Sequence, residues 1–249
     1  MTIIVGLICA DGIILASDSQ TTYGTTKRPD VEKISVVEFT NTTALVAESG
    51  SAQISGKVVE IMQGKAKGIA LTDYRMVAEI AQESLRETRN YLMEINKGCN
   101  FSEEKWERFF RDENPVELMI AHYFGDTPYI YTVDLFTCIA NKAKLHYEAI
   151  GCGANLGDYL LSEISHSGMK LKAALTIPLY VVEKVKEHDA YCGGPSKLAV
   201  IFPTGVTRIC PKIAIDDFVK RMSSILTSKQ VMFDLQMILE KISQESGNY

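Results

Sequence analysis

The sequence lacks several features that would assign it quickly to a class of protein. Its 249 residues include 26 lysines and arginines against 31 aspartates and glutamates, so it lacks the basic surplus that a nucleic-acid-binding face requires. No apolar run reaches the roughly 18 residues of a membrane span. The apolar start of the chain lacks a basic n-region and is interrupted at Asp11 and Gly12, which is not typical of a signal peptide. We therefore expect a cytoplasmic protein with neither a nucleic-acid nor a membrane partner.

Metal-binding motifs are also missing. The chain has six cysteines, but no two have the C-x-x-C spacing of a zinc site, and the four histidines are scattered. In a protein that is not exported, the cysteines are expected to be reduced thiols. The sequence therefore predicts neither a metal nor an organic cofactor.

What the sequence does contain is enough apolar material for one large core. Hydrophobic residues make up 46% of the chain, and no linker or repeat marks a boundary, so residues 1–249 are expected to form a single domain. Apolar runs with turn signals predict strands at 3–9, 13–18, 33–39, 43–48, 116–123, 128–134, 139–150, 197–202 and 205–210. Helical periodicity predicts helices at 51–63, 73–95, 155–166, 171–187 and 216–243.

Pairs of helices that alternate with sets of antiparallel strands indicate layers. We expect an α+β fold, a four-layer αββα sandwich in which two mostly antiparallel sheets lie between helix layers. Residues 19–32 are expected to be a polar loop. Residues 96–114 are expected to be an insertion. Its aromatics either cover the outer rim, contact a neighbouring subunit, or belong to an ordinary solvated loop with a tucked tryptophan. Residues 216–249 are expected to be a C-terminal helical segment.

The second residue is the most informative one for function. Thr2 follows Met1 and leads directly into an apolar strand. Initiator methionine is commonly removed before a small residue such as threonine. A threonine at the new N-terminus carries a hydroxyl that can act as a nucleophile and an α-amine that can act as its base.

Several short motifs appear in a fixed order after Thr2. They comprise the turn at 11–12, A-S-D-S-Q-T-T at 16–22, K-I at 33–34, Y-T-V-D at 131–134, A-I-G-C-G at 149–153 and D-A-Y-C-G-G at 189–194. Together they resemble the catalytic β-type subunits of the proteasome, within the N-terminal nucleophile hydrolases. The length and the glutamine at position 20 suggest a divergent bacterial member.

The resemblance implies catalytic roles for six residues. Thr2 would be the nucleophile, and Lys33 would favour its alkoxide and keep the neighbouring amine unprotonated. Asp18 would hold Lys33 charged through a buried ion pair, and Asp189 would orient the network near the amine. Cys152 and Cys192 occupy positions where the family has serines, and a thiol is a weaker hydrogen-bond donor than a hydroxyl.

The resemblance also implies where the substrate binds. A backbone N–H of Ser49 or Gly50 would form the oxyanion hole, with Ser49 in the usual place of the family's glycine. The substrate would lie extended along Thr22 and the strand before Gly50. Thr21, Val31, Ala47 and Ser51 would line the first specificity pocket, which their small to medium size suits to a modest apolar side chain.

The implied activity is that of a threonine-type endopeptidase acting on peptides or unfolded proteins in stacked homo-oligomeric rings. Substrates must be delivered into a closed chamber, so an ATPase unfoldase is a possible partner. Two alternatives stay open. The cysteines favour a catalytically weak or silent structural subunit, and the terminal threonine also suits a hydrolase of small amides.

Overall fold

A computed structural model of the chain describes residues 2–23, 26–99, 101–210 and 215. The first of its two five-stranded sheets has the order β10-β1-β2-β11-β12, and the second has the order β5-β6-β7-β8-β9. The strands of the first sheet are β1 (Ile3–Cys9), β2 (Gly12–Ser17), β10 (Tyr147–Gly151), β11 (Lys197–Ile201) and β12 (Thr207–Ile209). Those of the second are β5 (Ile34–Glu38), β6 (Thr43–Gly50), β7 (Val116–Phe124), β8 (Thr127–Asp134) and β9 (Ala140–Lys142). Neighbouring strands pair antiparallel throughout both sheets.

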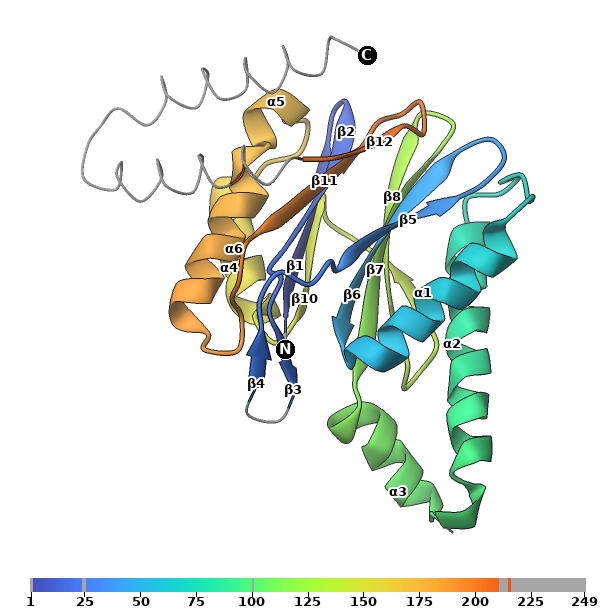
Figure 1. Ribbon diagram of the computed structural model, residues 1–249. Helices are drawn as coiled ribbons and strands as arrows, with labels where there is room; N and C mark the ends of the chain where they lie inside the picture. The colour runs from blue at the N-terminus through green and yellow to red at the C-terminus, as the bar shows by residue number, and fades with distance from the viewer. Residues whose placement is uncertain (1, 24–25, 100, 211–214, 216–249) are drawn as a thin grey trace.

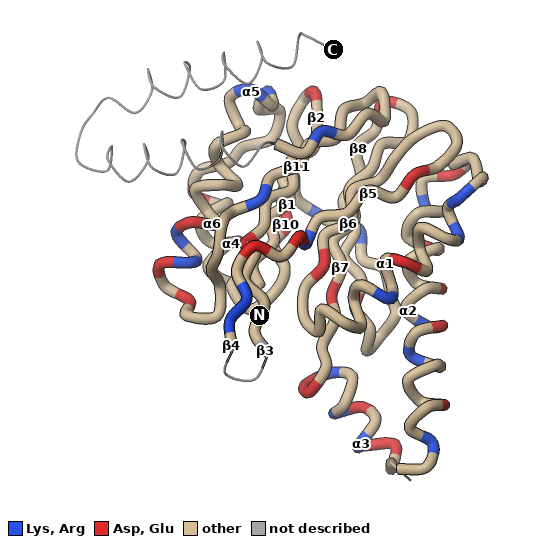
Figure 2. Tube along the Cα trace, in the orientation of Figure 1, with Lys and Arg blue, Asp and Glu red and all other residues tan. Residues whose placement is uncertain are grey.

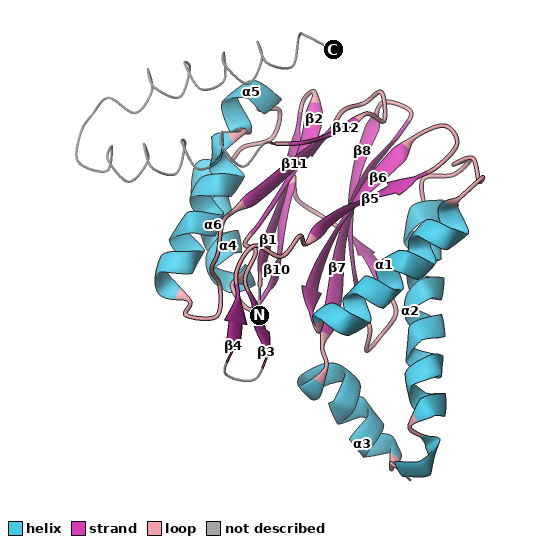
Figure 3. Cartoon of the chain, in the orientation of Figure 1, coloured by secondary structure: helices cyan, strands magenta, loops and turns pink. Residues whose placement is uncertain are grey.

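The two sheets lie face to face between helices (Figures 1 and 3). One helix layer consists of α1 (Ala52–Ala66) and α2 (Met76–Ile95), and the other of α4 (Ala154–Ile164), α5 (Leu171–Ala174) and α6 (Thr176–His188). The prediction of an α+β sandwich with helices on both outer faces is confirmed. That residues 1–249 form one domain stays a prediction, and the helical segment predicted over 216–249 lies outside the described residues.

Strand β1 shows why the layers form. Ile3, Val5 and Leu7 pack in the core under the helices α4 and α6, whereas Ile4 packs in the core between the sheets. Because successive side chains of a strand point to opposite faces, an almost uniformly apolar strand requires cover on both faces. The apolar start of the chain is therefore a central strand, between β10 and β2.

The structure corrects three expected elements. The strand expected over 139–150 is two strands, since β9 ends the second sheet and β10 begins the chain's return to the first. The expected helix 171–187 is divided into α5 and α6. The loop expected over 19–32 contains a small hairpin of β3 (Thr21–Tyr23) and β4 (Thr26–Arg28).

The segment 96–114 is helical rather than an open loop. It contains α3 (Glu103–Arg108), flanked by a 3-10 turn (Lys97–Cys99) and a π-turn (Phe109–Glu113). Phe110 is almost fully buried, and its ring stacks on that of Trp106 at a centroid distance of 5.5 Å. These aromatics therefore pack within the chain, and α3 lies below α1 and α2 in Figure 1. Among the described helices, none combines the length and apolar character needed to cross a bilayer.

Candidate active site

Thr2, Lys33 and Asp18 form a closed group of polar side chains at the start of β1. The Lys33 Nζ donates one hydrogen bond to Thr2 Oγ1 and another to Asp18 Oδ1, each at 2.8 Å. Asp18 is fully buried and Lys33 is only 5% exposed. The fold therefore brings together three polar residues that lie up to 31 positions apart in the sequence. Their burial leaves water little access to the two charges.

Backbone hydrogen bonds fix Asp18 in this group. Its Oδ1 also accepts from the Ile3 N–H at 3.2 Å, and its Oδ2 accepts from the Gly193 N–H at 3.0 Å. Asp18 directly follows β2, which pairs with β1, so the sheet register brings its carboxylate to the first residues of the chain. A buried carboxylate that accepts bonds from a lysine and two backbone amides is fully compensated for the loss of water.

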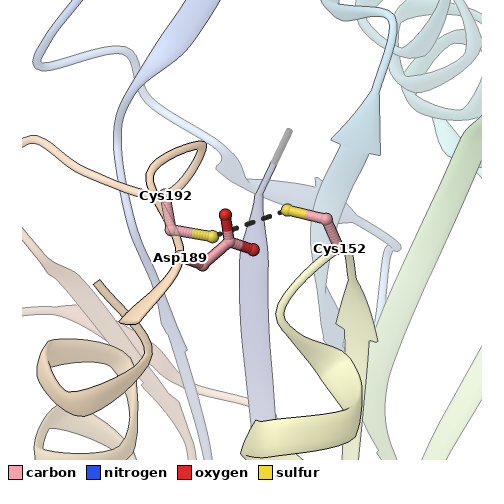
Figure 4. A group of neighbouring side chains, drawn as sticks. All are labelled: Cys152, Asp189 and Cys192. Carbon is pink, nitrogen blue, oxygen red and sulfur yellow. Dashed lines mark hydrogen bonds between the residues drawn. The ribbon is translucent and has the colours of Figure 1, made fainter. Parts of the chain in front are cut away.

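A second group, the thiol pair, lies on another side of Thr2. The Cys152 and Cys192 sulfurs are 3.6 Å apart, and the Cys152 Sγ donates to the Thr2 carbonyl oxygen at 3.5 Å. The Asp189 carboxylate completes the group within 4.8 Å (Figure 4). The hydrogen bond from Cys192 lowers the pKa of the Cys152 thiol, whereas that bond and burial raise the pKa of Cys192. The two thiols therefore form one hydrogen-bonded unit beside the N-terminal residue.

Two glycines allow the backbone to come close to the site. Gly151 has φ +94, and a Cβ there would lie 2.2 Å from the Thr2 carbonyl oxygen. Gly50 has φ +96, and a Cβ there would lie 1.8 Å from the Pro115 carbonyl oxygen. Both positions favour glycine because of their conformation and their crowding. Gly151 thereby allows the end of β10 to lie against Thr2, and Gly50 allows the end of β6 to lie against Pro115.

A cavity of about 160 Å³ opens beside Thr2. This volume is below the roughly 300–1,000 Å³ of typical small-molecule sites and suits a single side chain of a longer substrate. Of the residues expected to bind substrate, Thr21, Thr22, Val31 and Ser51 line the cavity together with Gly50. Its full lining is Thr2, Gln20, Thr21, Thr22, Val31, Lys33, Glu48, Gly50, Ser51, Ala52, Gln53 and Ser55.

One expected pocket residue on β6, Ala47, needs correction, whereas the proposed oxyanion role of the Ser49 or Gly50 backbone stays a prediction. Ala47 is fully buried in the core between the sheets and is not among the residues that line the cavity. Ser49 lies on the same face of the strand, where its hydroxyl would be 3.1 Å from a Cβ on Gly151. Because side chains alternate along a strand, Glu48 and Gly50 reach the cavity instead.

Glu48 is the functional candidate that the sequence did not reveal. Its Oε2 is buried with no hydrogen-bond partner among the described residues. Burial raises the pKa of its carboxyl, although the Ser55 hydroxyl and the Lys33 charge oppose this effect. Figure 2 shows basic positions on the exposed strand β4. The alternation of side chains after Leu45 is the one signal that could have identified Glu48.

Known proteins share this architecture. The chain is 20% identical to proteasome subunit beta 1 of Thermococcus kodakarensis over 204 residues, which cover 82% of this chain and 90% of that protein. It superposes with a TM-score of 0.69 on Anbu, an ancestral beta-subunit, from Yersinia bercovieri, at 14% identity over 91% of this chain and 96% of the other. The Anbu (Gly-1) mutant from Hyphomicrobium sp. strain MC1 gives a TM-score of 0.70 with the same identity and coverage.

A family profile also matches most of the chain. A profile described as proteasome subunit matches residues 2–201, which include Thr2, Lys33 and the thiol pair. At the level of the family, the match supports a hydrolase of the peptidase type. The chain therefore belongs to the proteasome subunit family.

Proposed function

We propose that the chain is a threonine-type endopeptidase whose nucleophile is Thr2, exposed after removal of Met1. The observation that carries this proposal is the pair of 2.8 Å hydrogen bonds from Lys33 to Thr2 Oγ1 and to Asp18. A lysine buried in a protein core without a partner would be destabilising, because its charge would lose its solvating water. A buried, paired lysine beside a hydroxyl stabilises the alkoxide that the hydroxyl becomes.

The proposed reaction uses the two ends of Thr2. The α-amine accepts the Oγ1 proton while Oγ1 attacks the peptide carbonyl, and the Lys33 charge stabilises the developing negative charge on the nucleophile. The backbone N–H of Gly50 is the proposed oxyanion donor, because Gly50 lines the cavity beside Thr2. The proton then passes to the leaving amine as the C–N bond breaks, leaving an acyl ester on Thr2.

Hydrolysis of this ester completes the cycle. The Thr2 amine guides a water molecule to the ester carbonyl and takes one of its protons. The proton returns to Oγ1 as the acid product leaves. The Cys152–Cys192 pair, oriented by Asp189, relays protons to and from the amine, in the positions where the family has serines.

The cavity suggests a preference for a basic side chain rather than the modest apolar one expected from the sequence. Glu48 offers a buried oxygen with no partner among the described residues, and a lysine or arginine of the substrate would supply that partner. The substrate backbone would lie extended beside Thr22 and Gly50, which both line the cavity.

Proteasome family members form oligomeric rings, and we propose that this chain forms stacked homo-oligomeric rings that confine hydrolysis in the cytoplasm. Peptides or unfolded proteins are the proposed substrates, with an ATPase unfoldase as the proposed feeding partner. The two rival functions are a silent structural subunit, favoured by the two cysteines, and a hydrolase of small amides.

The test is Thr2→Ala in the full chain, measured on panels of fluorogenic peptides and small amides. We expect wild-type protein to cleave peptides and the variant to lose turnover by more than about 10⁴-fold. Mass spectrometry of the native N-terminus must show that Met1 is absent from the active form. Full peptidase activity in Thr2→Ala would overturn the mechanism. A wild-type chain that has lost Met1 but cleaves no substrate would favour the silent structural subunit.

A further inference from the structure

The thiol pair has a property that the proposed proton relay does not need. Cys152, Cys192 and Asp189 each offer a metal-ligating atom, and these three atoms lie within 4.8 Å of one another. Figure 4 shows the two sulfurs turned toward each other with the Asp189 carboxylate beside them. A proton relay needs only a chain of polar groups, whereas these three ligand atoms are clustered within 4.8 Å of one another.

The spacing of the sulfurs matches a tetrahedral metal ion better than a disulfide. Zinc–sulfur bonds of about 2.3 Å in a tetrahedron place two sulfurs about 3.8 Å apart, close to the observed 3.6 Å. A disulfide needs a sulfur separation of about 2.05 Å, so the two sulfurs would have to approach each other by roughly 1.5 Å.

The donors are held in place by bonds that do not involve a metal. The Asp189 Oδ1 accepts from the Tyr191 N–H at 2.8 Å, which leaves Oδ2 for another partner. The Cys192 N–H donates to the Asp189 carbonyl at 3.1 Å, so both ligands belong to one turn after α6. Such outer bonds orient ligands and raise metal affinity. Cys152 is exposed while Cys192 is buried, so an ion can enter from the Cys152 side.

We propose that Cys152, Cys192 and Asp189 bind a divalent, thiophilic ion of the Zn²⁺ class. Binding releases two thiol protons to solvent and forms two metal–sulfur bonds and one metal–oxygen bond, with no oxidant. Three protein ligands leave one coordination position for a fourth donor. Two thiolates and one carboxylate supply the negative charge that favours a cation.

The ion would also control the peptidase. This step rests on the proposed function, in which the Thr2 amine is the base. The Cys152 sulfur lies 3.5 Å from the Thr2 carbonyl oxygen, so the bound ion would lie next to the N-terminal residue. Once Met1 is removed, the amine is a nitrogen donor for the fourth position. An amine whose lone pair is bound to the ion cannot accept the Oγ1 proton.

The direct test is titration of the reduced, metal-stripped full chain with Co²⁺, followed by Zn²⁺ displacement. We expect one Co²⁺ per chain, with thiolate-to-cobalt charge-transfer absorption and the intense visible bands of a tetrahedral site. Cys152→Ser, Cys192→Ser and Asp189→Asn should each weaken binding by about 10-fold or more. Cys99→Ser, which removes an exposed thiol outside the group, should leave binding unchanged.

The second measurement follows peptide turnover. Zn²⁺ should inhibit the wild-type enzyme, a chelator should restore it, and Cys152→Ser/Cys192→Ser should need at least ten times more Zn²⁺ for half-inhibition. Absence of charge-transfer absorption, its survival in the double variant, or a Cys152–Cys192 disulfide in place of metal binding would overturn the inference and leave the proposed peptidase untouched. If the chain binds metal but cleaves no peptide, the metal site stands, whereas the proposed peptidase activity and its inhibition by the ion are rejected. A circular dichroism spectrum of each variant checks that it is folded.

Discussion

The two polar groups that flank Thr2 differ in almost every physical respect. On one side, Asp18 and Lys33 are buried, carry opposite charges, and share short hydrogen bonds with Thr2 Oγ1 and with the backbone. On the other side, two thiols at 3.6 Å share a single weak bond, and one of them is exposed.

The two groups would serve different parts of Thr2: the ion pair acts on the proposed nucleophile, Oγ1, and the thiols act on the proposed base, the α-amine. Stabilising an alkoxide requires a fixed charge at a fixed distance, and only a buried ion pair provides it at low cost in reorganisation. Moving a proton to or from an amine requires only a donor and an acceptor of suitable pKa. We therefore expect changes on the charged side to be far more damaging than changes on the thiol side.

The largest effect is expected for Lys33→Ala. Turnover should fall by about 10³-fold or more, since the alkoxide loses its charge partner. The free energy of unfolding should also fall by about 3–5 kcal/mol, because the fully buried Asp18 loses its counter-ion. Steady-state kinetics and urea unfolding measure the two effects on one preparation.

A double variant separates these two effects. Lys33→Met with Asp18→Asn removes both charges, so stability should largely recover while turnover stays lost. If the double variant regained activity together with stability, Lys33 would act only through folding, and the contrast between the two sides of Thr2 would disappear.

An intermediate effect is expected for Glu48→Gln, on the charged side but beyond the ion pair. Cleavage after lysine or arginine should fall by about 10- to 100-fold in kcat/KM, the worth of a charge-assisted hydrogen bond, while cleavage after leucine changes little. Peptides that differ only at that residue give the measurement. Glu38→Gln, which alters an exposed glutamate of β5 outside the cavity, is the matched control.

The pH dependence of this preference has a definite sign. Burial raises the pKa of Glu48 above its ordinary 4.5, so its carboxyl becomes neutral at a higher pH than an exposed glutamate does. The preference for basic over apolar residues should therefore weaken as the pH falls, beginning above pH 4.5. A preference that is constant from neutral pH down to 4.5 would contradict the role of Glu48.

Much of the fold could be predicted from the sequence because long apolar segments must be buried in the core. The segments at 3–9 and 116–123 are central strands with cover on both faces, as their composition requires. The run at 139–150 could not be divided correctly, because the division depends on long-range pairing: β9 pairs with β8 in one sheet, and β10 pairs with β1 in the other. The small β3–β4 hairpin is polar and was indistinguishable from a loop.

The site was harder to predict where one position decides the face of a strand. Thr2, Asp18 and Lys33 could be selected because motif order carries over across deep sequence divergence. The same reasoning placed Ser49 where the family has glycine, and the structure puts Gly50 at the cavity. A shift of one residue along a strand exchanges its two faces, so the expectation fell on Ala47 in the core and overlooked Glu48.

The smallest effect is expected on the thiol side, from Cys152→Ser with Cys192→Ser. Hydroxyls are stronger donors than thiols, and a gain of about 1 kcal/mol in one hydrogen bond corresponds to roughly a 5-fold rise in turnover. Single-turnover kinetics on a peptide substrate measures this rise, with Cys99→Ser as the control. A fall of 100-fold or more would mean that the acidity of the Cys152 thiol is used in the reaction, and the two sides of Thr2 would be equally demanding. A rise would mean that the thiols are poorer relays than the serines they replace, so their presence would favour a role outside proton transfer, such as the binding of a thiophilic metal ion.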